Sequence, residues 1–277
     1  MKICRSKSSK KVFSTVHQSR VPIFSPTQRP TKRVQCAVET AWGRVRVMGR
    51  LGQRHRDLLD ALDDSTLQKV TTPDGCQHRL VDPHKLRAIL GRKGGRASAG
   101  MVETLVKDLT EALVQIDTTS GLHIIGHIFD EARWHEGAGP GEAARFGFDT
   151  RRLYRLKMGA AWCEFIQKDL QFSYDRKLIG ALQYGVSQAV ARLLLSHRGC
   201  TRVEVDTALA QVGIEPGEGQ PLWDARRRLA GDREGLLGLG IVINQGMITV
   251  RRTGSAGAES PVAGAESPIA GAESPAL

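Results

Sequence analysis

The sequence PLWDARRRLAGDREGLLGLGIVINQGMITVRR, residues Pro221–Arg252, combines a basic helix with a β-hairpin. Its first part has apolar residues at helical spacing, and Pro221 suits a first helical turn, where its missing N–H costs nothing. In the second part, Asn244-Gln245-Gly246 separates two short apolar runs, which is typical of a hairpin turn. Basic residues lie on the helix and at the end of the hairpin: Arg226, Arg227, Arg228, Arg233, Arg251 and Arg252.

A basic helix followed by a hairpin is the layout of a winged helix-turn-helix. In that layout the helix enters a major groove of DNA and the hairpin contacts the flanking backbone. A plainer interpretation is an amphipathic helix with a solvated arginine face, packed on an ordinary hairpin. These residues alone leave both interpretations open.

The bulk composition points to a globular protein with a polyanionic partner. The 277 residues allow one large or two small domains, and 40% hydrophobic with 25% charged residues is ordinary for a globular chain. A formal net charge of +11 favours nucleic acid or an acidic membrane surface as the partner. The sequence has neither an apolar run of about 18 residues, as in a transmembrane helix, nor the apolar stretch of a secretory signal. Five cysteines without a CxxC pair predict no zinc site and no disulfide, as in a cytoplasmic protein: Cys4, Cys36, Cys76, Cys163 and Cys200.

Both ends of the chain have compositions that predict disorder. Residues 1–35 contain nine Lys or Arg, no Asp or Glu and few apolar residues, so we expect a disordered basic arm. The arm is either a nonspecific DNA tether or a leader without a role. Residues 254–277 contain three seven-residue copies, GAESPVA, GAESPIA and GAESPAL, each with a proline that prevents a helix.

A first unit of strands and helices follows the arm. Residues 42–51 alternate as a half-buried strand, and residues 53–62 have helical spacing. This helix carries four acids, which we expect on a solvated face because no histidine or metal-ligand set joins them for catalysis: Asp57, Asp60, Asp63 and Asp64. Further on, Asp82 and Pro83 predict the N-cap and the first residue of another helix.

A basic, glycine-rich loop, Gly91–Arg96, joins that helix to the next one. It is not a phosphate-binding P-loop, because no Gly-Lys-Ser/Thr sequence follows. We expect its basic residues to contact DNA phosphates: Arg92, Lys93 and Arg96. Ser98 caps the following helix, which we expect to run to about Ile116. The exposed face of this helix is acidic, so it suits packing or dimer contacts better than reading a groove.

Residues 122–133 and 144–157 predict two strands joined by the glycine-rich loop 137–141, which form a long wing of the first unit. His123 and His127 have the spacing of zinc ligands on a helix, but on a strand they sit well apart and no third ligand is evident. We therefore predict no metal site and no cofactor.

The second half repeats this order of elements without repeating the sequence. Residues 177–196 predict one long helix, residues 201–205 a strand, and Asp206 the cap of a helix that ends near Val212. The basic helix and hairpin complete the order. The predicted fold class is therefore α+β, mostly helical, with two tandem winged-helix domains (helix-turn-helix plus β-hairpin) and disordered tails.

Two stretches, in this order, resemble plasmid replication initiator proteins of the Rep/TrfA type: WGRVRVMGRLGQRHRDLLDAL (Trp42–Leu62) and GVSQAVARLLLSHRG (Gly185–Gly199). The resemblance covers roughly residues 40–252, rests on framework residues and includes no catalytic signature. It implies that a domain of residues 161–253 makes the main base contacts. A domain of residues 36–160 would then contribute dimerisation and accessory DNA contacts. By position, the arginines of the 221–234 segment fall on the reading helix.

The resemblance also implies a function and partners. Such initiators bind repeated sites in double-stranded DNA at a plasmid origin, help melt the adjacent DNA, and recruit the host initiator and the replicative helicase; they often act as homodimers on their own gene. The alternative is a transcriptional regulator with the same domains, for which a single palindrome is expected in place of direct repeats of about 17–22 bp. A nuclease or relaxase is disfavoured because the three tyrosines lie away from any histidine pair: Tyr154, Tyr174 and Tyr184.

Overall fold

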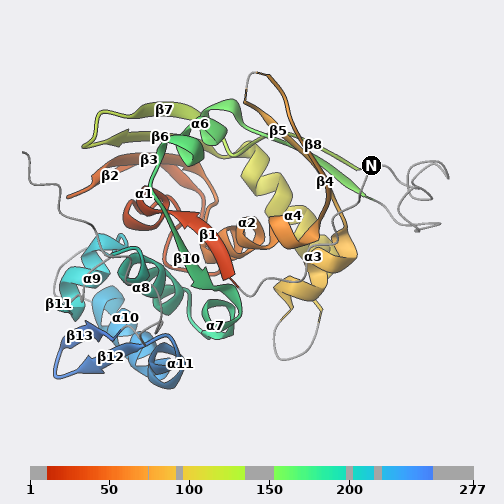
Figure 1. The fold of residues 1–277 in the computed structure, drawn as a ribbon. Helices are drawn as coiled ribbons and strands as arrows, with labels where there is room; N and C mark the ends of the chain where they lie inside the picture. The colour runs from red at the N-terminus through yellow and green to blue at the C-terminus, as the bar shows by residue number, and fades with distance from the viewer. Residues whose placement is uncertain are drawn as a thin grey trace, which may run out of the picture.

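The computed structural model describes residues 11–73, 75–91, 96–134, 153–197, 202–214 and 220–251. These residues form two units, each around its own apolar core (Figure 1). The first core collects buried residues between Val21 and Phe165. The second core runs from Tyr174 to Val250 and also includes Val12. Trp162, Cys163 and Phe165, which follow the predicted boundary at residue 160, pack in the first core.

The first unit has two antiparallel four-stranded sheets. One sheet, in the order β2-β3-β6-β7, consists of Arg33–Thr40, Gly43–Gly49, Leu113–Thr118 and His123–His127. The other, in the order β4-β5-β9-β8, consists of Thr66–Thr71, Gln77–Val81, Tyr154–Met158 and Phe129–Trp134. The helices of this unit are α2 (Gln53–Ser65), α3 (Pro83–Leu90), α4 (Ala99–Glu111) and α6 (Ala160–Lys168).

The predicted starts of α3 and α4 are confirmed. The Asp82 carboxylate accepts the backbone N–H groups of the first turn of α3, and the Ser98 hydroxyl accepts the N–H of Met101 at 3.1 Å. The predicted end of the second helix at Ile116 is wrong. From residue 113 onward buried and half-buried residues alternate, so Ile116 faces the core from strand β6 instead.

The second unit consists of short helices around a three-stranded sheet, β11-β13-β12. Its helices are α7 (Arg176–Ala181), α8 (Gly185–Leu195), α9 (Val205–Gln211), α10 (Gln220–Gly231) and α11 (Arg233–Gly238). Its strands are β11 (Arg202–Glu204), β12 (Ile241–Asn244) and β13 (Met247–Val250). The predicted hairpin is confirmed. Gln245 and Gly246 both have positive φ, 47° and 76°, as a tight two-residue turn requires.

Two predicted helices of this half differ in the structure. The single helix expected over residues 177–196 is two helices, α7 and α8. The Asp232 carboxylate accepts the backbone N–H groups of Gln183 and Tyr184, both at 2.9 Å, and thereby holds the start of α8. Asp206 is not the cap of α9 but lies in its first turn, because the helix already begins at Val205.

The expectation of a disordered arm over residues 1–35 is wrong from residue 11 onward. Strand β1 (Lys11–Thr15) pairs antiparallel with β10 (Gln171–Asp175), and helix α1 (Val16–Arg20) follows it. Val12 enters the second core, while Ile23 and Phe24 enter the first. The segment is thus held by partners about 160 residues away along the chain, which its own composition does not reveal. Residues 1–10 and the 254–277 repeats lie outside the described residues.

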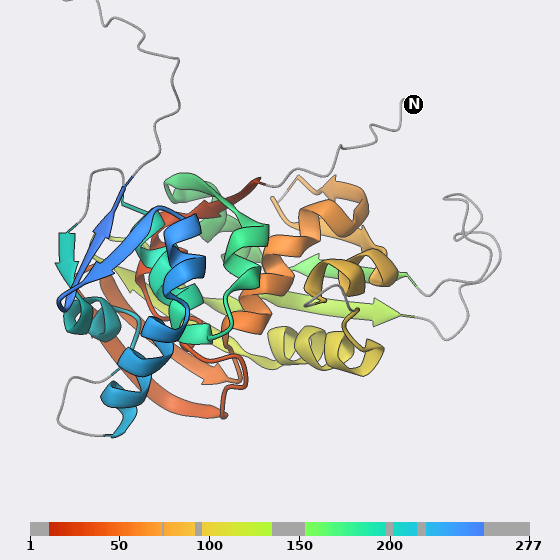
Figure 2. The same ribbon diagram turned by 90° about the horizontal axis from the view of Figure 1, so that it is seen from below.

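The two units share one order of elements (Figures 1 and 2). In each, a strand precedes a pair of helices and a hairpin comes later: β5, α3, α4, β8 and β9 in the first unit, and β11, α9, α10, β12 and β13 in the second, where α11 lies between α10 and the hairpin. The sheets agree as well, since β5-β9-β8 corresponds to β11-β13-β12. The first unit adds β4 at the sheet edge and inserts β6 and β7 between its second helix and its hairpin.

No helix within the described parts of the chain is long and apolar enough to span a membrane.

A buried histidine joins two helices of the first unit and predicts a pH dependence. His55 on α2 is 2% exposed; its Nδ1 accepts the N–H of Gly52, and its Nε2 lies 3.1 Å from Asp108 on α4. Burial lowers the pKa of His55 below its ordinary value, although Asp108 opposes the shift. Burial and the nearby Arg20 lower the pKa of His197 as well.

We expect the free energy of unfolding to fall between pH 7.5 and pH 5. The unfolded chain binds protons at these histidines from about pH 6.5 downward, whereas the folded chain resists them until a lower pH. His55→Gln keeps a donor for Asp108 and should flatten the dependence, leaving the part due to His197. Urea unfolding at several pH values measures this. A pH dependence equally steep in His55→Gln and in the unaltered protein would contradict the role given to His55.

Candidate nucleic-acid interface

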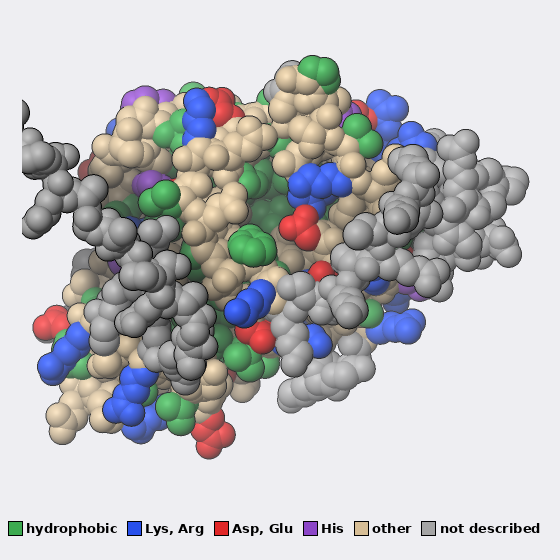
Figure 3. Space-filling view, in the orientation of Figure 1, with side chains coloured by type: hydrophobic (Ala, Val, Ile, Leu, Met, Phe, Trp, Pro, Cys, Tyr) green, Lys and Arg blue, Asp and Glu red, His purple; other side chains and the backbone are tan. Residues whose placement is uncertain are grey.

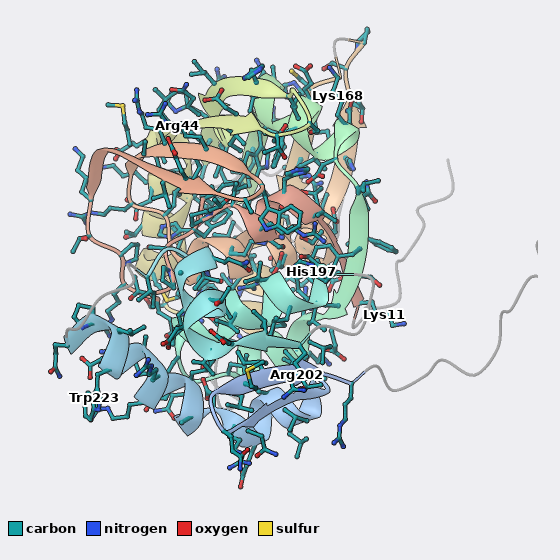
Figure 4. All side chains as sticks on the ribbon, turned by 90° about the vertical axis from the view of Figure 1, so that its left-hand side faces the viewer. Lys11, Arg44, Lys168, His197, Arg202 and Trp223 are labelled. Atoms are coloured by element: carbon teal, nitrogen blue, oxygen red, sulfur yellow. The ribbon has the colours of Figure 1, made fainter. Side chains whose placement is uncertain are left out.

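Helix α10 has one buried face and one basic face. Ala225 and Leu229 pack in the second core, whereas the three consecutive arginines between them point outward. Their side chains are about half exposed or more: 51% for Arg226, 64% for Arg227 and 49% for Arg228. Trp223, one turn before Arg227, lies on the outer surface of the same helix (Figure 4). The structure therefore places these predicted site residues together, on a rigid helix and accessible from outside.

The arginines of α10 also have acidic neighbours. The Arg226 guanidinium donates two hydrogen bonds to Asp206 on α9. Arg227 lies 3.3 Å and Arg228 4.0 Å from Asp224, on their own helix. Exposed ion pairs of this kind contribute little to stability because solvent screens them, so a phosphate or a base edge can take over these donors. Figure 3 shows basic and acidic side chains interspersed over this corner of the molecule.

The other predicted residues of the second unit lie beside the hairpin. Arg233 is not on α10, because the chain bends at Asp232 and Arg233 begins α11. From there its Nη2 donates to Asn244 Oδ1 at 3.2 Å, at the hairpin turn. Arg251 is exposed directly after β13, and its backbone N–H donates to the carbonyl of Gly240 at 2.7 Å. Arg252 lies outside the described residues.

The first unit presents a smaller basic surface at the start of α4. Arg96 is exposed there, and a side chain at Gly100 would meet no atom within 4 Å, so a ligand can approach the helix closely at this point. The connection is held in place, because Arg87 Nε donates to the carbonyl of Ala97 at 2.8 Å. Arg92 and Lys93 lie outside the described residues.

Sequence reasoning did not single out two arginines on the wing of the first unit. Arg133 on β8 and Arg155 on β9 face each other across the hairpin, one pair away from the residues that lead into segment 135–152. Like charges in directly opposite positions destabilise a hairpin, but Glu131 on the same strand pairs with Arg133 and offsets part of this repulsion. The sequence feature that could have identified these arginines is their position on either side of the glycine-rich loop 137–141.

The four acids of α2 do not all lie on the solvated face that the sequence predicts. Asp57 and Asp60 are buried, 7% and 6% exposed, not solvated. Both accept hydrogen bonds from Arg192 Nη2 on α8, at 2.7 and 2.8 Å. Tyr174 Oη donates to Asp60 Oδ2 at 2.6 Å, and Arg56 lies 3.2 Å from the same carboxylate. We call these five residues the inter-unit joint, because they connect α2 of the first unit to α8 of the second.

The joint is electrically balanced, with two arginines and two aspartates. Burial alone would lower the pKa of Arg192, but Tyr174, Asp60 and Asp57 around it raise the pKa on balance. Burial and Asp60 raise the pKa of Tyr174, so its hydroxyl stays protonated and donates. The joint thus acts as a structural ion-pair network. No group of three potential metal ligands occurs within the residues that the structure describes.

Two crystal structures, both of domains 2 and 3 of RctB, resemble the chain. The first has a TM-score of 0.55 and 10% sequence identity, and the match covers 86% of this chain and 98% of the RctB chain. The second has a TM-score of 0.51 and 11% identity, with 85% and 96% covered. No family model and no curated protein sequence matches the chain. At such low identity the likeness shows the fold alone. The fold is mixed α+β, with 44% helix and 33% strand, and so contains more strand than the mostly helical fold predicted from the sequence.

Proposed function

We propose that the chain is a DNA-binding replication initiator whose two units are tandem winged-helix domains. The observation that carries the proposal is the shared order of elements, a strand, a helix pair and a hairpin, with the same strand order in both sheets. The fold likeness to RctB supports it, since RctB is a replication initiator of Vibrio chromosome II that is related to plasmid Rep proteins.

In this proposal α10 enters a major groove and the β12–β13 hairpin lies along the neighbouring backbone. Arg226 and Arg227 face base edges, with guanine O6 and N7 as the preferred acceptors. Arg228, Arg233, Arg251 and the basic residues of segment 92–96 hold phosphates, as Arg252 does beyond β13.

The first unit makes the second set of contacts. Seen from below, α4 and α10 both lie along the lower edge of the molecule, one in each half (Figure 2). One face of a duplex therefore meets both helix pairs, and the exposed start of α4 with Arg96 is its point of contact in the first unit. The inter-unit joint fixes the distance between the two helix pairs, and so the spacing of the two halves of a site.

As an initiator the protein would bind direct repeats at an origin, destabilise the adjacent duplex and recruit a host initiator and a replicative helicase, with a homodimer acting on its own gene. The test places the DNA that flanks the gene on a vector without an origin and supplies the chain from a second plasmid. The proposal expects autonomous replication that depends on the chain. Repression of a reporter without any replication would identify a transcriptional regulator instead.

A further inference from the structure

The contact between Asp206 and Arg226 differs from every other ion pair described on α10. Asp206 lies in the first turn of α9, so two helices meet in this pair. Arg226 Nε donates to Asp206 Oδ1 at 2.7 Å, and Nη2 donates to Oδ2. The hydrogen bond from Arg226 lowers the pKa of Asp206, and Asp206 raises the pKa of Arg226. Both groups therefore stay charged over the physiological pH range.

Two parallel hydrogen bonds fix the plane of the Arg226 guanidinium. A guanidinium has five N–H donors in one plane, of which this pair uses the Nε–H and one Nη2–H. The remaining donors lie on Nη1 and Nη2, and one N–H of each forms the adjacent terminal edge. That edge has the spacing that matches guanine O6 and N7 in a bidentate contact.

Space for a ligand adjoins the pair. An open hollow of about 550 Å³ lies between the start of α9, helix α10 and the turn of the β12–β13 hairpin. Arg226, Asp206, Gln245 and Gly246 are among the residues that line it. A duplex whose groove receives α10 would thus reach Arg226 without moving either helix.

Stability alone gives little reason for this geometry. An exposed ion pair contributes little, and α9 and α10 are already joined by buried Ala208, Leu209, Ala225 and Leu229. Arg227 and Arg228, in contrast, share Asp224 through single contacts on their own helix, so neither guanidinium is oriented by a bidentate ion pair. Arg226 has already lost the side-chain freedom that a bidentate contact requires, which favours specific binding.

We propose that Asp206 is a positioning residue that orients Arg226 for bidentate recognition of one guanine. The inference rests on the proposed function, in which α10 enters a major groove. The Asp206 carboxylate is then expected to affect affinity and sequence discrimination in opposite directions. Asp206 weakens binding to all DNA, because it places a negative charge near phosphates, and it increases discrimination at one base pair.

The experiment uses the full chain and the duplex that it selects from a randomised library. Each guanine of this duplex is replaced in turn, and the dissociation constants are measured by fluorescence anisotropy. Wild-type protein is expected to lose affinity at the Arg226 guanine by a factor of roughly 5–150, as for one bidentate pair. Arg226→Ala should abolish this discrimination. Asp206→Asn should reduce it to a few-fold while it binds random duplex as tightly as wild type or more tightly.

Asp224→Asn is the matched control, because it removes the same charge beside Arg227 and Arg228. It should strengthen binding to random duplex but keep the discrimination at the Arg226 guanine. Adding Asp206→Asn to Arg226→Ala should cause no further change in the discrimination at this guanine, because Asp206 acts through Arg226. Full discrimination by Asp206→Asn, or equal loss of discrimination in the control, would overturn the inference and leave DNA binding intact. Failure of wild type to select any sequence would overturn the proposed function as well.

Discussion

Replacing Arg192 by Met is expected to lower the free energy of unfolding by about 3–5 kcal/mol. Arg192 is 3% exposed and donates to Asp57, Asp60 and Gln53, the last at 2.6 Å. Methionine nearly fills the space of the side chain but leaves Asp57 in the interior without its cation and Asp60 with Arg56 alone. Such uncompensated buried charges cost several kcal/mol, more than the lost hydrogen bonds themselves. Urea unfolding followed by circular dichroism measures the change.

Two further variants make this result specific. Arg228→Met makes the same replacement at an exposed position and should change stability by no more than about 0.5 kcal/mol. Adding Asp57→Asn to Arg192→Met restores the charge balance, because Asp60 keeps Arg56 as its partner, and should recover part of the loss, even if the single variant does not fold. Equal stability of Arg192→Met and the unaltered protein would mean that the inter-unit joint does not contribute to the free energy of unfolding.

Replacing Arg227 by Ala is expected to weaken binding to the selected duplex by a factor of roughly 5–150 and to weaken binding to random duplex less. Arg227 lies on the side of α10 opposite the buried Ala225 and Leu229, and its guanidinium carbon is 5.0 Å from the centre of the Trp223 ring. Stacking on an aromatic ring holds the guanidinium outward, toward base edges. Titrations with both duplexes at one salt concentration measure the difference.

Arg228→Ala is the control for this prediction. As a phosphate contact it should weaken binding to both duplexes equally and reduce the slope of log K against log salt by about 0.9. If Arg227→Ala also loses equally on both duplexes, Arg227 is a phosphate anchor and not a reader of bases.

The second unit was largely predictable from sequence, because its signals are local. The two apolar runs in Ile241–Val250, the glycine turn and the spacing of Ala225 and Leu229 each depend on residues close together in the chain. The exposed arginines of α10 follow from the same spacing. Their pairing with Asp206 does not, since α9 and α10 meet only after the whole unit has folded.

The inter-unit joint and the N-terminal strand could not be predicted in the same way. Four acids on α2 are typical of a solvated face, and the burial of Asp57 and Asp60 becomes tolerable because Arg192, on the other unit, donates to both. One signal existed. Arg192 is the single charged residue of α8, Gly185–Leu195, and a lone charge in an apolar helix often has a buried partner.

The joint also explains why two particular stretches carried the resemblance to plasmid initiators. Residues 42–62 contain Asp57 and Asp60, and residues 185–199 contain Arg192, so the two stretches meet in the structure. The two stretches on which the expected resemblance rests therefore meet at the joint, and the arginines that we propose to face DNA lie elsewhere.

Sequence selection tests the central claim most directly. The full chain is incubated with a randomised duplex library, the bound DNA is sequenced, and the affinity for the enriched sequence is measured at several salt concentrations. The account predicts one guanine-containing motif that spans about two helical turns, and an affinity that falls steeply as salt increases. Absence of an enriched motif, together with binding that does not change with salt, would contradict it.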